Sequence, residues 1–193
     1  MNHATASLIG GVGLLERAIG YTLGSLQLVT PQAMSRPSPC LDWDLHALLQ
    51  HMNDSLKALH EAVDVGHIDL AARNYGDPAA SPVATLRNRA CSMLGAWANA
   101  DDRAWVSVEG CPVTSSVVTA TGALEIAVHG WDVAQACGRP RPIPDALADD
   151  LLPLADLLVT DTDRPGRFAA PVDVPPWVHP GELLVAFLGR DPG

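Results

Sequence analysis

Apolar residues recur every three or four positions in six stretches of the chain, which is the spacing of amphipathic helices. In the second stretch, for example, Leu48, Leu49 and Met52 fall on one helical face. The six predicted helices are residues 8–29, 45–65, 82–99, 116–136, 145–159 and 181–188. This succession predicts an all-α protein.

Residues that favour helix caps mark several of these boundaries. Asp44 precedes the second helix, and a carboxylate at this position accepts a hydrogen bond from the first turn. Ser81 followed by Pro82 indicates the start of the third helix, and Gly138 the end of the fourth. Between these two helices, residues 103–113 carry strand-forming residues around a Gly-Cys-Pro break, so a short strand or extended crossover is expected there.

Composition narrows the class of protein. The chain has 193 residues, of which 48% are hydrophobic and 18% charged, so we expect one folded domain over residues 1–193. The net charge of -10 disfavours nucleic acids and anionic membranes as partners. We see no secretory leader or membrane-length apolar run, and the four cysteines are scattered as free thiols would be. A cytoplasmic protein is expected.

The fourth predicted helix carries a carboxylate and an imidazole four residues apart, Glu125 and His129. At this spacing the two side chains point within about 40° of each other, one turn apart. Both are good ligands for zinc and similar divalent ions, although the same spacing also produces ordinary ion pairs on helices. Ile126, Val128 and Trp131 surround the pair, and a buried acid and histidine need partners.

A third ligand is expected from the second helix, where His51 lies near the apolar face. His46 and His60 lie about 140° and 180° away around that helix and are predicted to face solvent or a helix flank. Three ligands with one open position are typical of a catalytic zinc site. We therefore predict that His51, Glu125 and His129 bind a divalent ion, zinc or another such as nickel.

Two further residues are candidates for supporting roles. Asp132 follows His129 by three positions and could orient a ligand, or it could be a solvent-facing helix carboxylate. Cys40, ahead of the second helix, is predicted to be a partly buried structural thiol rather than a nucleophile. Trp43 and Trp131 are expected to anchor the core.

Three segments carry a resemblance to a known family. They are Ser38-Pro-Cys-Leu-Asp-Trp-Asp-Leu leading to Leu49-Gln-His-Met, then Glu125-Ile-Ala-Val-His-Gly-Trp-Asp-Val-Ala, and finally Leu183-Leu-Val-Ala-Phe-Leu-Gly-Arg. In these segments the chain resembles the DinB-like superfamily, specifically the branch of mycothiol-dependent maleylpyruvate isomerases and their single-domain metal-binding relatives. The resemblance implies a DinB/YfiT-like four-helix bundle with extra short C-terminal helices, and it implies the same ligands, His51, Glu125 and His129.

The resemblance also implies a low-molecular-weight thiol such as mycothiol as cosubstrate, with a small electrophile as its partner. One hypothesis is therefore a metal-dependent thiol S-transferase or isomerase-like enzyme. A second is a non-catalytic metal or small-ligand binding protein, because a fold and a ligand set do not guarantee turnover. A third is a bundle in which Glu125 and His129 pair without metal. Exposed apolar positions on a helical bundle would also allow a homodimer.

Overall fold

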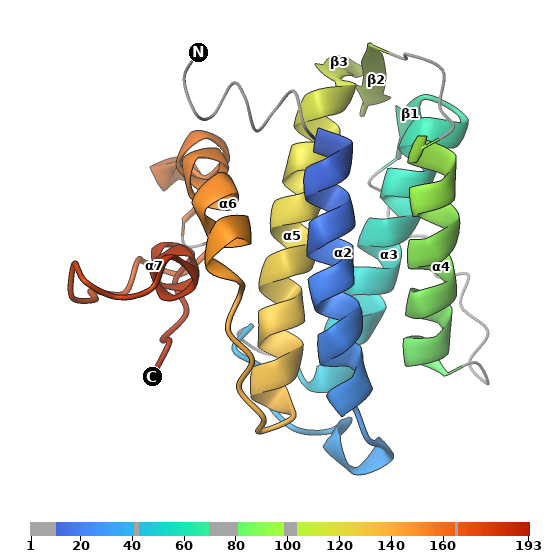
Figure 1. Cartoon of the computed structure of the whole chain (residues 1–193). Helices are drawn as coiled ribbons and strands as arrows, with labels where there is room; N and C mark the ends of the chain where they lie inside the picture. Colours follow the sequence, from blue (N-terminus) through green and yellow to red (C-terminus); the bar gives the residue numbers. More distant parts are fainter. Residues whose placement is uncertain (1–10, 41–42, 70–80, 99–103, 165) are drawn as a thin grey trace.

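The computed structural model describes residues 11–40, 43–69, 81–98, 104–164 and 166–193 (Figure 1). The predicted all-α class is confirmed: within these residues, four long helices form a bundle, and two shorter helices follow it. Residues 8–10 and 99 of the predicted helices and residue 103 of the predicted extended segment lie outside the described residues. The elements are α2 (Gly11–Ser25), η1 (Leu26–Leu28), η2 (Pro31–Ala33), α3 (Leu45–Asp64), β1 (His67–Ile68), α4 (Pro82–Ala98), β2 (Trp105–Val108), β3 (Cys111–Thr114), α5 (Ser115–Ala136), α6 (Asp145–Leu158), η3 (Asp161–Asp163) and α7 (Pro180–Phe187).

The four long helices form two pairs, α2 beside α5 and α3 beside α4 (Figure 1). Thr22 of α2 donates a hydrogen bond to the backbone oxygen of Ile126 in α5, at 2.8 Å. In the other pair, the indole of Trp97 donates to the backbone oxygen of Leu59, at 3.1 Å. Helix α3 also packs directly on α5, and this contact brings together the two helices that carry the predicted ligands.

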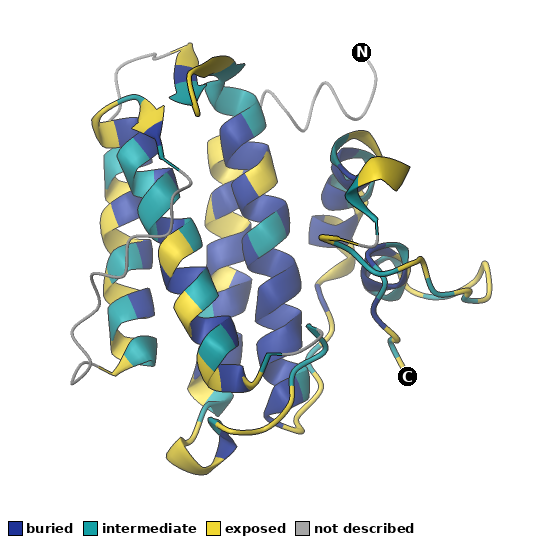
Figure 2. Cartoon of the chain, turned by 180° about the vertical axis from the view of Figure 1, so that it is seen from behind, coloured by how far each residue is buried: buried dark blue, intermediate teal, exposed yellow. Residues whose placement is uncertain are grey.

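Helix α5 is the central element of the bundle. It is dark blue over most of its length in Figure 2, because residues on most sides of it are buried. A helix that is apolar around most of its circumference belongs in an interior. It ends at Ala136, and Gly138 follows the cap as predicted, with a φ of +67° that suits glycine. The amide of Arg139 donates to the backbone oxygen of Ala134.

Helix α3 begins at the predicted cap. The carboxylate of Asp44 accepts a hydrogen bond from the amide of Ala47 at 2.8 Å. One face of α3 is apolar and buried, whereas His46 is exposed, as expected. His51 is half-buried at the edge of that apolar face, so its ring can reach α5.

A small sheet lies at one end of the bundle (Figure 1). The predicted extended segment is confirmed as an antiparallel hairpin of β2 and β3, whose two turn residues, Glu109 and Gly110, have φ of +49° and +82°. Two positive φ values match the turn type that fits the twist of a two-residue hairpin. Strand β1, which the sequence pattern did not predict, pairs with β2 in parallel.

The segment after α5 folds back against the bundle. Arg17 of α2 lies 2.5 Å from the carboxylate of Asp150 in α6, and α6 in turn packs on α7. With this packing, the segment after α7 lies against α5, and Arg190 in that segment is buried beside α5. Within the described part of the chain, no helix is both long and apolar enough to cross a membrane.

The contact between α2 and α5 depends on a glycine. A Cβ at Gly130 would collide with the hydroxyl oxygen of Thr22 and come within a tight 3.2 Å of its Cα, whereas a Cβ at Gly20 would meet nothing within 4 Å. We expect Gly130→Ala to lower the free energy of unfolding by about 1–3 kcal/mol, because the helices must move apart. The matched control Gly20→Ala should raise it by about 0.5–1 kcal/mol, since alanine favours helix. Urea unfolding of both variants measures this, and equal effects would contradict it.

Candidate metal centre

The three predicted ligands lie together between α3 and α5. His51 Nε2 is 2.5 Å from Glu125 Oε1, and His129 Nε2 is 3.2 Å from the same oxygen. The two imidazole rings meet edge to face with centroids 5.0 Å apart. One donor atom from each residue lies within 4.8 Å of the other two. Antiparallel packing of α3 on α5 thus brings together residues that are 74 positions apart.

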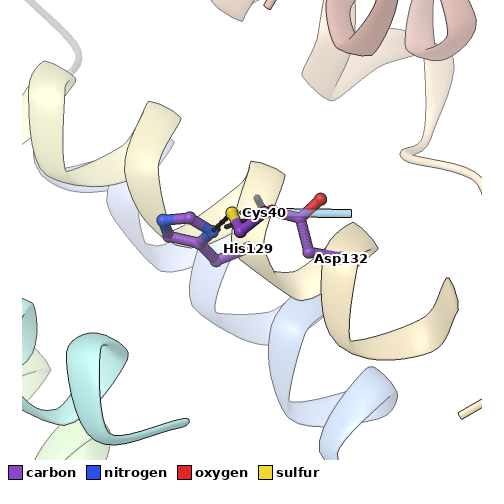
Figure 3. Close-up of side chains that lie close together, drawn as sticks. All are labelled: Cys40, His129 and Asp132. Carbon is purple, nitrogen blue, oxygen red and sulfur yellow. Dashed lines mark hydrogen bonds and ion pairs between the residues drawn. The ribbon is translucent and has the colours of Figure 1, made fainter. Parts of the chain in front are cut away.

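The imidazole of His129 has a different partner at each nitrogen. Its Nε2 faces Glu125, while its Nδ1 lies 2.8 Å from Asp132 Oδ2, one turn along α5 (Figure 3). A carboxylate on the far nitrogen holds a histidine in the orientation and tautomer that suit metal binding at the near one. Asp132 is 0% exposed, so the solvent-facing alternative for this residue is wrong.

Asp132 is held by an arginine that the sequence pattern did not single out. Arg190 donates from Nη2 to Asp132 Oδ2 at 3.0 Å and from Nε to Oδ1 at 3.3 Å, and its side chain is 9% exposed. Arg190 is the last residue of the third family-like segment. A charged residue directly after an apolar helix is the sequence signal that could have identified it. Its partner, 58 positions away, became visible only in the folded chain.

Cys40 completes this buried group. It is partly buried, as predicted, and its Sγ lies 3.3 Å from Asp132 Oδ2 and 3.6 Å from His129 Nδ1 (Figure 3). Arg190 Nη2 donates to the same sulfur at 3.2 Å. The thiol therefore packs against the groups that position His129.

Burial and charge oppose each other in this cluster. Burial raises the pKa of Glu125, but His129 and His51 outweigh it and hold that pKa well below its ordinary value. Burial lowers the pKa of His129, yet Glu125 and Asp132 raise it well above its ordinary value. Burial raises the pKa of Asp132, whereas His129 and Arg190 bring it below the ordinary value. The carboxylates are therefore ionised and favour a protonated His129, which would have to release this proton to bind a metal ion.

Among the described residues, two groups of donor atoms at this place are candidates for binding a metal. The first, Cys40 with His129 and Asp132, is already in contact with the guanidinium of Arg190, whose charge opposes a second cation there. The second group is His51, Glu125 and His129, and nitrogen and carboxylate oxygen are the donors that zinc uses in open sites. The second group fits a divalent ion.

The rings around the second group form one wall of the site. Trp43 packs on His51 with ring centroids 4.7 Å apart, and it lies 6.4 Å from the ring of His129. Trp43 is half-buried against the candidate ligands, while Trp131 is a buried core residue as expected. On the open side, the hydroxyl of Ser55 donates to Glu125 Oε1 at 3.3 Å.

A cavity of about 590 Å³ begins at His51 and Glu125 and continues along α3 and α5 to the small sheet. The side chains of these two candidate ligands are 35% and 33% exposed, whereas that of His129 is 8% exposed. The cavity therefore reaches the donor group from the side of His51 and Glu125. Its volume is in the range of small-molecule sites.

The bundle, its two short C-terminal helices and this donor group define a DinB-like all-α protein. Residues 15–134 match the family model described as mycothiol maleylpyruvate isomerase N-terminal domain. This match covers more than half of the chain, and the chain belongs to that family. It includes the three candidate ligands, Cys40 and Asp132, and it stops before Arg190. No curated protein and no solved structure gives a significant match.

The buried ion pair leads to a stability prediction. Arg190→Met should lower the free energy of unfolding by about 3 kcal/mol, because it leaves the Asp132 carboxylate buried without its cation. Adding Asp132→Asn to this variant should restore part of the loss, since the unpaired charge is then removed. Urea unfolding of the two single variants and the double variant measures the coupling.

The matched control is Arg167→Met. Arg167 is 75% exposed and lies 3.8 Å from Asp163, so its loss should change the free energy of unfolding by less than about 0.5 kcal/mol. An Arg190→Met variant as stable as this control would contradict the structural role of the buried pair.

Proposed function

We propose that the chain binds one divalent metal ion, zinc in the first place, through His51, Glu125 and His129. The observation that carries this proposal is the convergence of three suitable donor atoms, with His129 oriented by a fully buried Asp132. The third hypothesis, a buried acid and histidine that pair without metal, accounts less well for the approach of His51 to the same carboxylate oxygen.

We further propose that the site supports a reaction of a low-molecular-weight thiol with a small electrophile. The family description names a mycothiol maleylpyruvate isomerase, and the donor group opens into a cavity large enough for small molecules. When bound, a divalent ion supplies Lewis acidity and favours the thiolate form of a thiol. In such a reaction sulfur forms a bond to an electrophilic carbon, the thiol proton is released, and an electron pair leaves that carbon with a leaving group or into a neighbouring bond.

The residues of the chain have defined parts in this proposal. His51 and Glu125 form the edge of the cavity, so they face both reactants. His129 is fixed from behind by Asp132, and Ser55 holds the Glu125 carboxylate. We also propose that the protein is cytoplasmic. The four cysteines without disulfide bonds support this location.

A second candidate function is non-catalytic binding of a metal or small ligand. Apart from the candidate ligand His51, the described residues that line the cavity include neither histidine nor cysteine. Besides the candidate ligands, a general base for a reaction would have to come from lining residues such as Asp54, Glu61 and Asp69. Thiol consumption with an electrophile by the zinc-loaded protein, set against the uncatalysed rate, separates the two functions, and no acceleration favours binding alone.

Metal content is the first measurement. The untagged protein should carry about one zinc or similar ion per chain by mass spectrometry, and His51→Ala and Glu125→Ala should each lose most of it, because a site with two ligands is weak. His46→Ala is the matched control, since His46 lies exposed on the same helix as His51 and should leave metal content unchanged. A wild type that stays metal-free after incubation with zinc or nickel would overturn the proposed metal site.

Asp132 is expected to act through His129. Asp132→Asn keeps the size of the side chain but removes the charge that orients the imidazole, so zinc affinity should fall about 10–100-fold. Competition with a chelator of known affinity measures this change. Unchanged affinity in a folded Asp132→Asn variant would show that the carboxylate is structural only.

A further inference from the structure

The cavity beside the candidate ligands has two chemically different ends. At one end are the polar groups of His51 and Glu125. At the other end, where α5 meets the small sheet, the wall includes the aliphatic side chains of Val108, Val113 and Val117. Leu59 of α3 and Ile68 of β1 extend this wall and are buried. An apolar wall of this kind favours the apolar body of a ligand.

Among the described residues, each basic side chain that lines the cavity away from the candidate ligands lies near a carboxylate. Lys57 Nζ lies 3.6 Å from the carboxylate of Glu61 on the same helix. Arg167 lies 3.8 Å from Asp163. The lining also includes the carboxylates of Asp54 and Asp69. Within the described lining, the carboxylates of Asp54, Glu61 and Asp69 thus outnumber the two basic residues.

An anionic ligand is disfavoured in this part of the cavity. It would lose hydration against the valine wall, and the carboxylates beside Lys57 and Arg167 would repel it. A neutral ligand carries no such cost, and a cationic one would be attracted by the excess of carboxylates.

We propose that the cavity takes a small, largely apolar molecule without negative charge, and that this molecule is the electrophile of the thiol-dependent reaction. The proposal rests on the function proposed above. The thiol binds at the polar end, and the electrophile binds at the valine-lined end, which favours an apolar molecule. A dicarboxylate such as maleylpyruvate is thereby disfavoured as the substrate of this chain, although the chain belongs to the family whose description includes that name.

Binding without turnover tests this selectivity. We would titrate 4-ethylbenzyl alcohol, 4-ethylbenzylamine and 4-ethylbenzoate, which share one apolar body, into the protein as purified and after chelation. The methyl NMR signals of Val113 and Val117 report occupancy of the apolar end, whether or not a metal is present. We expect the alcohol and the amine to bind at least tenfold more tightly than the carboxylate in both preparations.

Two matched variants locate the binding. Val117→Asp places a carboxylate in the wall and should weaken the alcohol at least tenfold. Val12→Asp makes the same change in the first turn of α2, where Val12 is exposed, and should leave binding unchanged. Both positions lie near helix N-termini, where an acidic residue is favourable, so both variants should fold.

Two outcomes would overturn the selectivity. One is a carboxylate that binds as tightly as the alcohol; if Arg167→Ala or Lys57→Ala abolishes this binding, the cavity is an anion site. The other is a set of three ligands that all leave the Val113 and Val117 signals unchanged. Metal content is measured separately, so a zinc-containing protein with either outcome retains the proposed metal site and loses only the proposed substrate class.

Discussion

The buried carboxylate of Asp132 is the constraint on which the site depends. A fully buried charge is tolerated only with partners, and Asp132 has three: the imidazole of His129, the guanidinium of Arg190 and the thiol of Cys40. These partners come from α5 itself, from the segment after α7 and from the segment before α3. One charge therefore joins three distant parts of the chain behind a single candidate metal ligand.

This network gives the two nitrogen atoms of His129 different tasks. Nδ1 is committed to Asp132, which leaves Nε2 to face Glu125 and the ring of His51. The charge of Arg190 also distinguishes the two clusters of donor atoms. Its guanidinium contacts the cluster around Cys40, so the cluster around Glu125 is the candidate cation site. The acid and the histidine four residues apart on α5 thus form a site in which the groups packed behind His129 fix the orientation of its ring.

The same helix also determines what can reach the site. α5 presents His129 and Asp132 to the interior and Glu125 to the cavity, while the valine at its first turn forms part of the apolar wall near the sheet. The close contact at Gly130 sets the position of α5 against α2. Small changes in this packing would move the donors and the cavity together, since both lie on one rigid element.

The sequence by itself determined the helices, their caps and the family, because helical periodicity, Asp44 and Gly138 act locally. It also narrowed the candidate ligands to one trio, since a histidine near an apolar face and a Glu-His pair on one helix are local patterns. Tertiary structure alone decided that Arg190 pairs with Asp132, that β1 joins the hairpin, and that the cavity ends in valines. These features join residues far apart in the chain, and their partners depend on how the helices pack rather than on any local preference.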